Sequence, residues 1–103
     1  MKAVWMGMIA ASALLAVGTA QANADLAKAS GCTNCHTVDK KLVGPAFKDV
    51  AAKYKDDPGA QARLEEKVKK GSQGVWGPVP MPPNSTVSDA NIKTLVTWIL
   101  SLK

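Results

Sequence analysis

The chain is short and mildly basic: its 103 residues carry a formal net charge of +5, and 47% of them are hydrophobic. A chain of this length forms one domain, and its scattered lysines include no arginine-rich run, so we expect no nucleic-acid partner. The only two cysteines lie within one five-residue window, which excludes a scaffold built on several disulfides.

The first 24 residues have the features of a secretory signal peptide. Lys2 precedes an apolar stretch over residues 3–17, and small residues follow up to an A-x-A pattern at 22–24. The alternative is an uncleaved membrane anchor, since the stretch approaches the roughly 18 residues that a spanning helix needs. Because no basic stop-transfer cluster follows, we predict cleavage, with residues 25–103 as an exported domain free of the membrane. A domain of this size usually needs a cross-link or a bound group that stabilises it in addition to its hydrophobic core.

The rest of the chain shows helical periodicity and no strand-like alternation, so the predicted fold class is all-α. Asp25 is expected to cap the first helix, Gly71 to close the third and Ser88 to cap the last, in which Trp98 packs against its neighbours. The predicted helices are short and cover about residues 25–30, 46–54, 60–70 and 89–102.

Residues 71–87 form a long segment that is dense in glycine and proline. Proline lacks the backbone N–H that a helix or a strand ladder needs. Neither can therefore continue through a segment with so many prolines. A loop of this length without secondary structure in so small a domain is usually functional.

The segment Cys32-Thr33-Asn34-Cys35-His36 carries the strongest chemical signal. C-x-x-C-H is the attachment motif of c-type haem: the two thiols add to one porphyrin, and the adjacent imidazole then lies beneath the iron. A dithiol redox pair would expect a βαβ context, which the sequence lacks. A zinc site needs four ligands, whereas His36 is the only histidine, and a simple disulfide leaves His36 unexplained. The motif therefore predicts covalent haem on Cys32 and Cys35, with His36 as an iron ligand.

Elimination identifies the second iron ligand. Of the four methionines, all but Met81 leave with the predicted signal peptide. A lone methionine more often fills a gap in a core, but Met81 stands between Pro80 and Pro82 in a loop, a stiff frame that suits a ligand. Lysine ligation and an open sixth position are the alternatives. Together, His36 and Met81 would close the iron to oxygen and raise its reduction potential, so we expect electron transfer and not catalysis.

These motifs resemble those of the small bacterial class I cytochromes c of the c-551/c-552 family. The resemblance covers residues 25–103 and is carried by Gly31 with the haem motif, Val43-Gly44-Pro45-Ala46, Gly71 to Pro78, Pro80 to Asn84, and Trp98 to Lys103. It implies a fold of about four short helices wrapped around one covalently bound haem c, with the glycine- and proline-rich segment as the methionine-ligand loop.

The resemblance also implies roles for single residues. The Pro45 carbonyl is expected to accept a hydrogen bond from the second ring nitrogen of His36. Trp76 is similar to the indole that donates to a haem propionate in this family, and Lys67 either matches a further propionate partner or is simply solvated. Asn84 matches an asparagine that hydrogen-bonds the ligand sulfur, with an ordinary turn asparagine as the alternative.

By the same resemblance, the chain is similar to monomeric periplasmic carriers that shuttle single electrons between respiratory proteins. The implied partners are redox proteins such as a quinol-oxidising complex, nitrite reductase, terminal oxidase or peroxidase. Lys40 and Lys41 would steer acidic partners, or serve solubility alone. One alternative is a haem sensor or peroxidase-like enzyme in which Met81 dissociates, although no distal histidine supports it. The other is a relay subunit within a larger complex.

Overall fold

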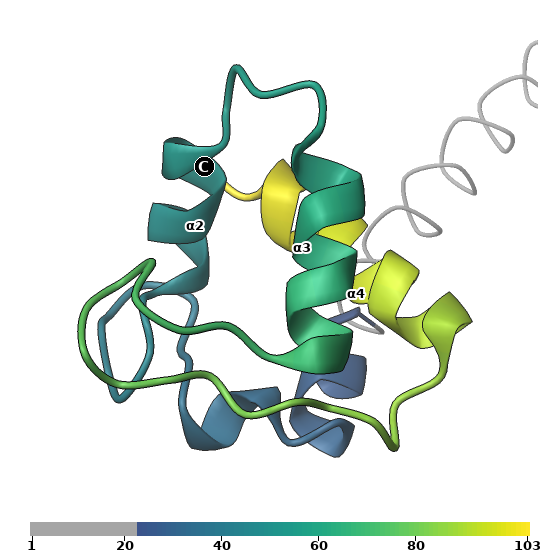
Figure 1. Ribbon diagram of the computed structural model, residues 1–103. Coiled ribbons are helices and arrows are strands. Elements are labelled where there is room, and N and C mark those ends of the chain that lie inside the picture. The colour runs from purple at the N-terminus through teal and green to yellow at the C-terminus, as the bar shows by residue number, and fades with distance from the viewer. Residues whose placement is uncertain (1–22) are drawn as a thin grey trace, which may run out of the picture.

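Figure 1 shows the computed structural model, which describes residues 23–103. Nearly all of the predicted signal peptide, residues 1–22, lies outside the described residues. The first described segment, residues 23–29, is helical. Asp25 therefore lies inside a helical segment, and the prediction that it caps the first helix is wrong for the full chain. Within the described residues, no helix combines the length and apolar character needed to cross a bilayer.

Four further helical elements follow, and local sequence explains where they begin and end. Gly31, with φ of 82°, turns the chain into a single 3-10 turn, and Gly71, with φ of 84°, ends the third of the four helices. The Ser88 side chain accepts a hydrogen bond from the Asn91 N–H at the start of the last helix. The helix boundaries predicted at Gly71 and Ser88 are therefore confirmed. The elements are η1 (Cys32–Asn34), α2 (Phe47–Lys53), α3 (Ala60–Lys70) and α4 (Asp89–Ser101).

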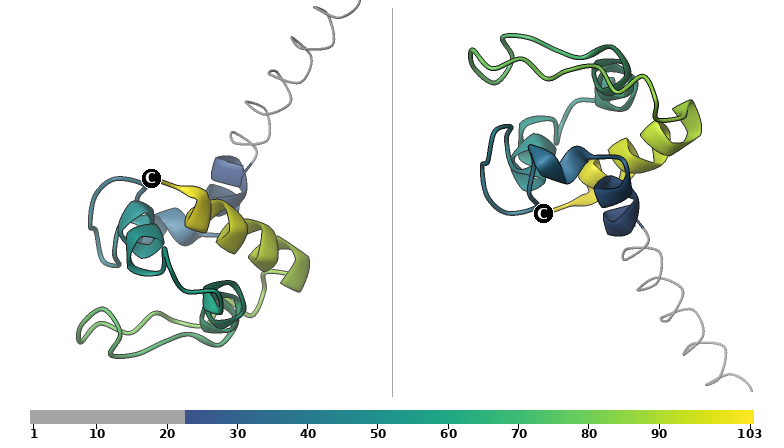
Figure 2. Two further views of the ribbon diagram at one scale, coloured as in Figure 1. Left: turned by 90° about the horizontal axis from the view of Figure 1, so that it is seen from above. Right: turned by 90° about the horizontal axis from the view of Figure 1, so that it is seen from below.

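α4 organises the packing, because it contacts both α2 and α3. Figure 2 shows it lying between residues 23–29 and α3. Ala27, Phe47 and Leu95 form the buried cluster where the first helical segment, α2 and α4 meet. The Trp98 ring meets Phe47 edge to face at a centroid distance of 5.6 Å, so its predicted role in helix packing is confirmed.

Two long connections project from the same side of these helices (Figures 1 and 2). One lies between η1 and α2, and the other, residues 71–88, joins α3 to α4. The described residues contain no strand, and their two isolated antiparallel bridges close these connections at the base, one in each. The pairs are His36 with Lys41 and Ser72 with Met81. Both predicted iron ligands are therefore bridge residues at the base of a loop.

Candidate functional site

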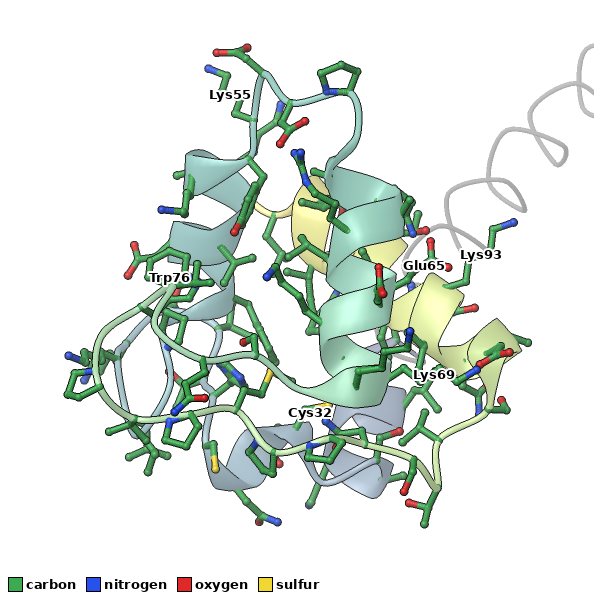
Figure 3. The ribbon with its side chains drawn as sticks, in the orientation of Figure 1. Cys32, Lys55, Glu65, Lys69, Trp76 and Lys93 are labelled. Carbon is green, nitrogen blue, oxygen red and sulfur yellow. The ribbon has the colours of Figure 1, made fainter. Side chains whose placement is uncertain are left out.

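A largely apolar cavity of about 440 Å³ lies between the helices and the long loop. Apolar side chains of α2, α3 and α4 form its wall, among them Val50, Leu64 and Val96. Six of the seven predicted site residues line it, and Asn84 does not; the six are Cys32, Cys35, His36, Pro45, Trp76 and Met81. In Figure 3, Trp76 lies next to α2, whereas Cys32 lies near the bottom of the view, below α3. The volume falls within the range of about 300–1,000 Å³ that is usual for ligand pockets.

The cysteine motif is folded into one tight turn. The N–H groups of Cys35 and His36 both donate to the Cys32 carbonyl, at 3.2 and 2.9 Å, so the two cysteines and the histidine are held on a single turn of chain. The two cysteines form no disulfide with each other, and both are partly buried. Burial raises the pKa of the Cys32 thiol, because a thiolate would lose hydration there. Cys32 also packs against the core cluster.

The His36 imidazole is fixed on two sides. Its Nδ1 lies 2.7 Å from the Pro45 carbonyl oxygen, and its ring stacks on Phe47 at a centroid distance of 5.1 Å. Because a carbonyl only accepts, Nδ1 must carry the proton, which leaves the Nε2 lone pair for a metal. A Cβ atom on Gly44 would lie 2.6 Å from the His36 Cε1, so only glycine fits against this ring. The hydrogen bond expected between His36 and Pro45 is present.

Met81 is held through its backbone. The Ser72 N–H donates to the Met81 carbonyl at 3.0 Å, and the Met81 N–H donates to the Ser72 carbonyl at 2.8 Å. A Cβ atom on Gly71 would lie 2.6 Å from the Met81 carbonyl oxygen, so glycine permits this close pairing. The pair fixes the start and the end of the loop segment that leads to Met81.

Asn84 fastens the loop to α3. Its backbone N–H and its side-chain Nδ2 both donate to the Val68 carbonyl, at 3.0 and 3.2 Å, and Nδ2 also lies 3.3 Å from the Pro82 oxygen. Asn84 thus satisfies a carbonyl in the last turn of α3, a role that sequence reasoning missed. Its hydrogen bond to the ligand sulfur stays a prediction.

Trp76 lies on the outer part of the loop and is 40% exposed. The Lys53 Nζ, at the end of α2, stands 5.1 Å from the centroid of its ring. Sequence reasoning did not single out Lys53, because nothing local distinguishes it from the other exposed lysines. Lys67, the second candidate propionate partner, is partly buried and lines the cavity.

The residues around the cavity fit haem c. Two thiols are available for thioether bonds, one imidazole offers a free nitrogen, and one thioether side chain is present. The apolar wall suits a flat macrocycle and would keep water from its iron.

Comparison with known proteins gives the same family throughout. The family model described as Cytochrome c matches residues 20–103. Cytochrome c-552 of Nitrosomonas europaea is 59% identical over 103 residues, which is the full length of both chains. Cytochrome c-551 of Pseudomonas aeruginosa is 52% identical over 99 residues, 95% of this chain and 94% of the other. The crystal structure of wild-type Nitrosomonas europaea cytochrome c552 superposes with a TM-score of 0.76, covering 78% of this chain and 99% of that one.

These likenesses establish the fold and the broad role of the chain. The fold is the class I cytochrome c fold, as expected from the sequence. Family membership implies covalently bound haem c and redox-protein partners, and the spacing of Cys32 and Cys35 fits the attachment motif. The chain therefore belongs to the cytochrome c family, among the c-551 and c-552 proteins, and is a haem-based electron carrier.

Proposed function

We propose that the chain is a periplasmic one-electron carrier whose haem iron is ligated by His36 and Met81. The observation that supports this most is the state of His36, whose Nδ1 is committed to the Pro45 carbonyl at 2.7 Å while Nε2 is left for the iron. Met81 lines the same cavity, on a loop that its pairing with Ser72 holds in place. Bound haem supplies an iron that alternates between the ferric and ferrous states.

The ligand pair determines what the site can do. Two protein ligands leave no open position for oxygen or peroxide, so the chemistry is limited to outer-sphere electron transfer. The Met81 thioether favours the ferrous state, and the apolar wall disfavours the additional charge of ferric iron. Both effects raise the reduction potential.

Redox partners would meet the protein at the mouth of the cavity. Leu42, Val43 and Val79 are 54%, 52% and 59% exposed, and the last two line the cavity. Lys41 lines it as well, and Lys40 precedes it in the chain. A small apolar patch beside lysines suits brief contacts with acidic partners such as a quinol-oxidising complex, nitrite reductase, terminal oxidase or peroxidase.

Optical spectra of the haem-loaded protein test the ligand assignment. The ferric protein should show the far-red methionine-to-iron band, and the ferrous protein should not bind carbon monoxide. Met81→Ala should abolish the band, admit carbon monoxide and lower the reduction potential. Thr86→Ala, at an exposed position of the same loop outside the cavity lining, is the matched control and should change none of these. Carbon monoxide binding by the unaltered protein would contradict the proposal.

The cellular part of the proposal has a separate test. Expression of the full chain in a bacterium that attaches haem should place the protein in the periplasmic fraction, with Asp25 as its first residue. Membrane-bound protein that retains residues 1–24 would indicate an uncleaved anchor.

A further inference from the structure

The polypeptide itself makes few contacts with the outer part of the long loop, residues 73–80. In the described part of the chain, no residue of this segment, hereafter the loop tip, makes a hydrogen bond or an ion pair. Val79 is 59% exposed, and Trp76 is 40% exposed. The hydrogen bonds of the loop lie at its base, in the Ser72–Met81 pair and at Asn84.

One contact ties the loop tip to a helix. The Lys53 Nζ stands 5.1 Å from the Trp76 ring centroid, within the range of a cation–π interaction. Lys53 occupies the last turn of α2, where the helix dipole favours a positive charge. A second aromatic ring, that of Tyr54, lies 6.0 Å from the same ammonium and helps to keep it near α2. Trp76 and other residues of the tip line the cavity, and so does Tyr54 at the end of α2, so this contact lies at the cavity edge.

We propose that Lys53 is a positioning residue that holds the loop tip over the cavity through Trp76, independently of the loop base that holds Met81. The proposal rests on the proposed function in one respect, namely that haem fills this cavity. Opening of the tip would then let water approach the haem while Met81 stays on the iron. The loop would thus be held at two separate places: the pairing of Ser72 with Met81 would hold the ligand, and Lys53 would hold the loop tip.

Amide hydrogen exchange of the haem-loaded protein, followed by mass spectrometry on peptides within residues 73–80, tests this. Lys53→Met keeps a long apolar side chain and removes the charge, so exchange in the tip should become about two- to fivefold faster, the change expected for one exposed cation–π contact. The far-red methionine-to-iron band should be unchanged. Lys53→Arg keeps a cation over the ring and should exchange like the unaltered protein.

Lys55→Met is the matched control. It makes the same change in net charge two residues away, and the Lys55 side chain makes no ion pair or ring contact with the described residues (Figure 3). Its tip should exchange like that of the unaltered protein. On a Trp76→Leu background, Lys53→Met should add nothing, because the partner ring is already gone.

The proposal would be overturned if Lys53→Met left amide exchange in the tip unchanged, or if Lys55→Met raised it equally. It would also be overturned if Lys53→Met raised exchange further on the Trp76→Leu background. Loss of the far-red band together with the faster exchange would be the fourth contradicting result. The last result would mean that tip and base open as one unit. Failure of the proposed function would be seen separately, because the unaltered protein would then lack the far-red band.

Discussion

The two loops that carry the predicted iron ligands are closed in the same way but supported differently. Each has one antiparallel bridge at its base, His36 with Lys41 and Ser72 with Met81. Backbone bonds also tie the histidine loop to its surroundings, from the Gly44 N–H to Cys35 at 2.7 Å and from the Phe47 N–H to Thr37 at 2.9 Å. In the described structure, the methionine loop has one such backbone bond besides its bridge, from the Asn84 N–H to the Val68 carbonyl at 3.0 Å, and residues 73–80 have none.

Because of this difference, the two predicted ligands are held in place by different parts of the structure. His36 is stacked on a buried ring and hydrogen-bonded to Pro45, so its position depends on the hydrophobic core. Met81 depends on a few backbone contacts with Ser72 and, through Asn84, with the end of α3. Changes at the methionine loop should therefore release a ligand while the fold persists, and changes at the histidine loop should affect both.

The largest expected effect is that of Gly71→Ala, at the base of the methionine loop. Alanine there would adopt a positive φ of 84° and place Cβ 2.6 Å from the Met81 oxygen. Strain of about 1–3 kcal/mol and overpacking of about 1–3 kcal/mol should add, and the far-red band should weaken.

Gly74→Ala separates the effect of backbone strain from that of the close contact with the Met81 oxygen. Gly74 has a φ of 81°, but no atom lies within 4 Å of the position that a Cβ would take there, so only the strain applies. Urea unfolding and ferric spectra of the two variants provide the comparison. Equal losses of stability with equal spectra would mean that the Met81 contact does not matter.

Gly44→Ala tests the histidine loop. Its Cβ would lie 2.6 Å from the His36 ring, which Phe47 and Pro45 prevent from moving away. We expect a loss of about 1–3 kcal/mol in the free energy of unfolding, together with less haem-loaded protein. Gly59→Ala is the control, since its nearest neighbour would lie 3.6 Å away. A Gly44→Ala protein as stable as the control would show that the ring is not confined.

Asn84→Ala sharpens the comparison at the other fastening of the methionine loop. It removes the side-chain hydrogen bonds to Val68 and Pro82 and keeps the backbone bond at 3.0 Å. We expect a loss of about 1 kcal/mol in urea unfolding. Asn91→Ala, on an exposed position of α4, removes a side chain with no hydrogen bond among the described residues and should be near neutral. If both variants unfold alike, Asn84 does not fasten the loop.

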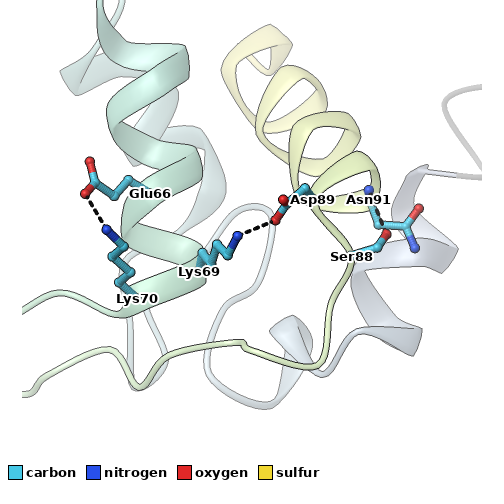
Figure 4. A network of polar contacts seen from close by, with 6 residues as sticks. All are labelled: Glu66, Lys69, Lys70, Ser88, Asp89 and Asn91. Atoms are coloured by element: carbon cyan, nitrogen blue, oxygen red, sulfur yellow. Dashed lines mark hydrogen bonds and ion pairs between the residues drawn. The ribbon is translucent and has the colours of Figure 1, made fainter.

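The smallest effect is expected at the ion pair that joins the two ends of the loop. Lys69 of α3 lies 2.8 Å from Asp89 of α4, as Figure 4 shows, and their side chains are 52% and 77% exposed. An exposed pair contributes roughly 0.2–1 kcal/mol, so Lys69→Met should lower stability by no more than that. Lys70→Met, which breaks the pair with Glu66 inside α3, is the control. A larger loss for Lys69→Met, abolished by salt, would mean that this pair matters more than its exposure suggests.

The predictions that succeeded from sequence rest on local signals. Gly71 and Ser88 mark helix ends through backbone geometry and a side-chain cap, which a short window of sequence contains. Ile92, Leu95 and Val96 follow i, i+3, i+4 spacing on the last helix, and all three are buried, as helical periodicity requires. The ligand-bearing motif is local too, so its turn and its cysteines could be located before any fold was known.

What the sequence did not reveal depends on contacts between distant residues. Lys53 and Trp76 are far apart in the chain, and an exposed lysine carries no mark of its partner. The Ser72–Met81 pair was hidden because the density of glycine and proline argues against any ladder, whereas these two residues both keep their N–H groups. Asn84 resembled a ligand partner or a turn residue, and its bond to Val68 follows only from how the loop returns to α3.

The closed base of the methionine loop also bears on how its length can vary. Because Ser72 and Met81 pair directly, the path between them can grow without moving either end. Residues 73–80 can therefore lengthen without displacing Met81, while the contact between Trp76 and Lys53 would shift. Between Met81 and Asn84 there is no such freedom, since an added residue would pull the ligand out of register with α3.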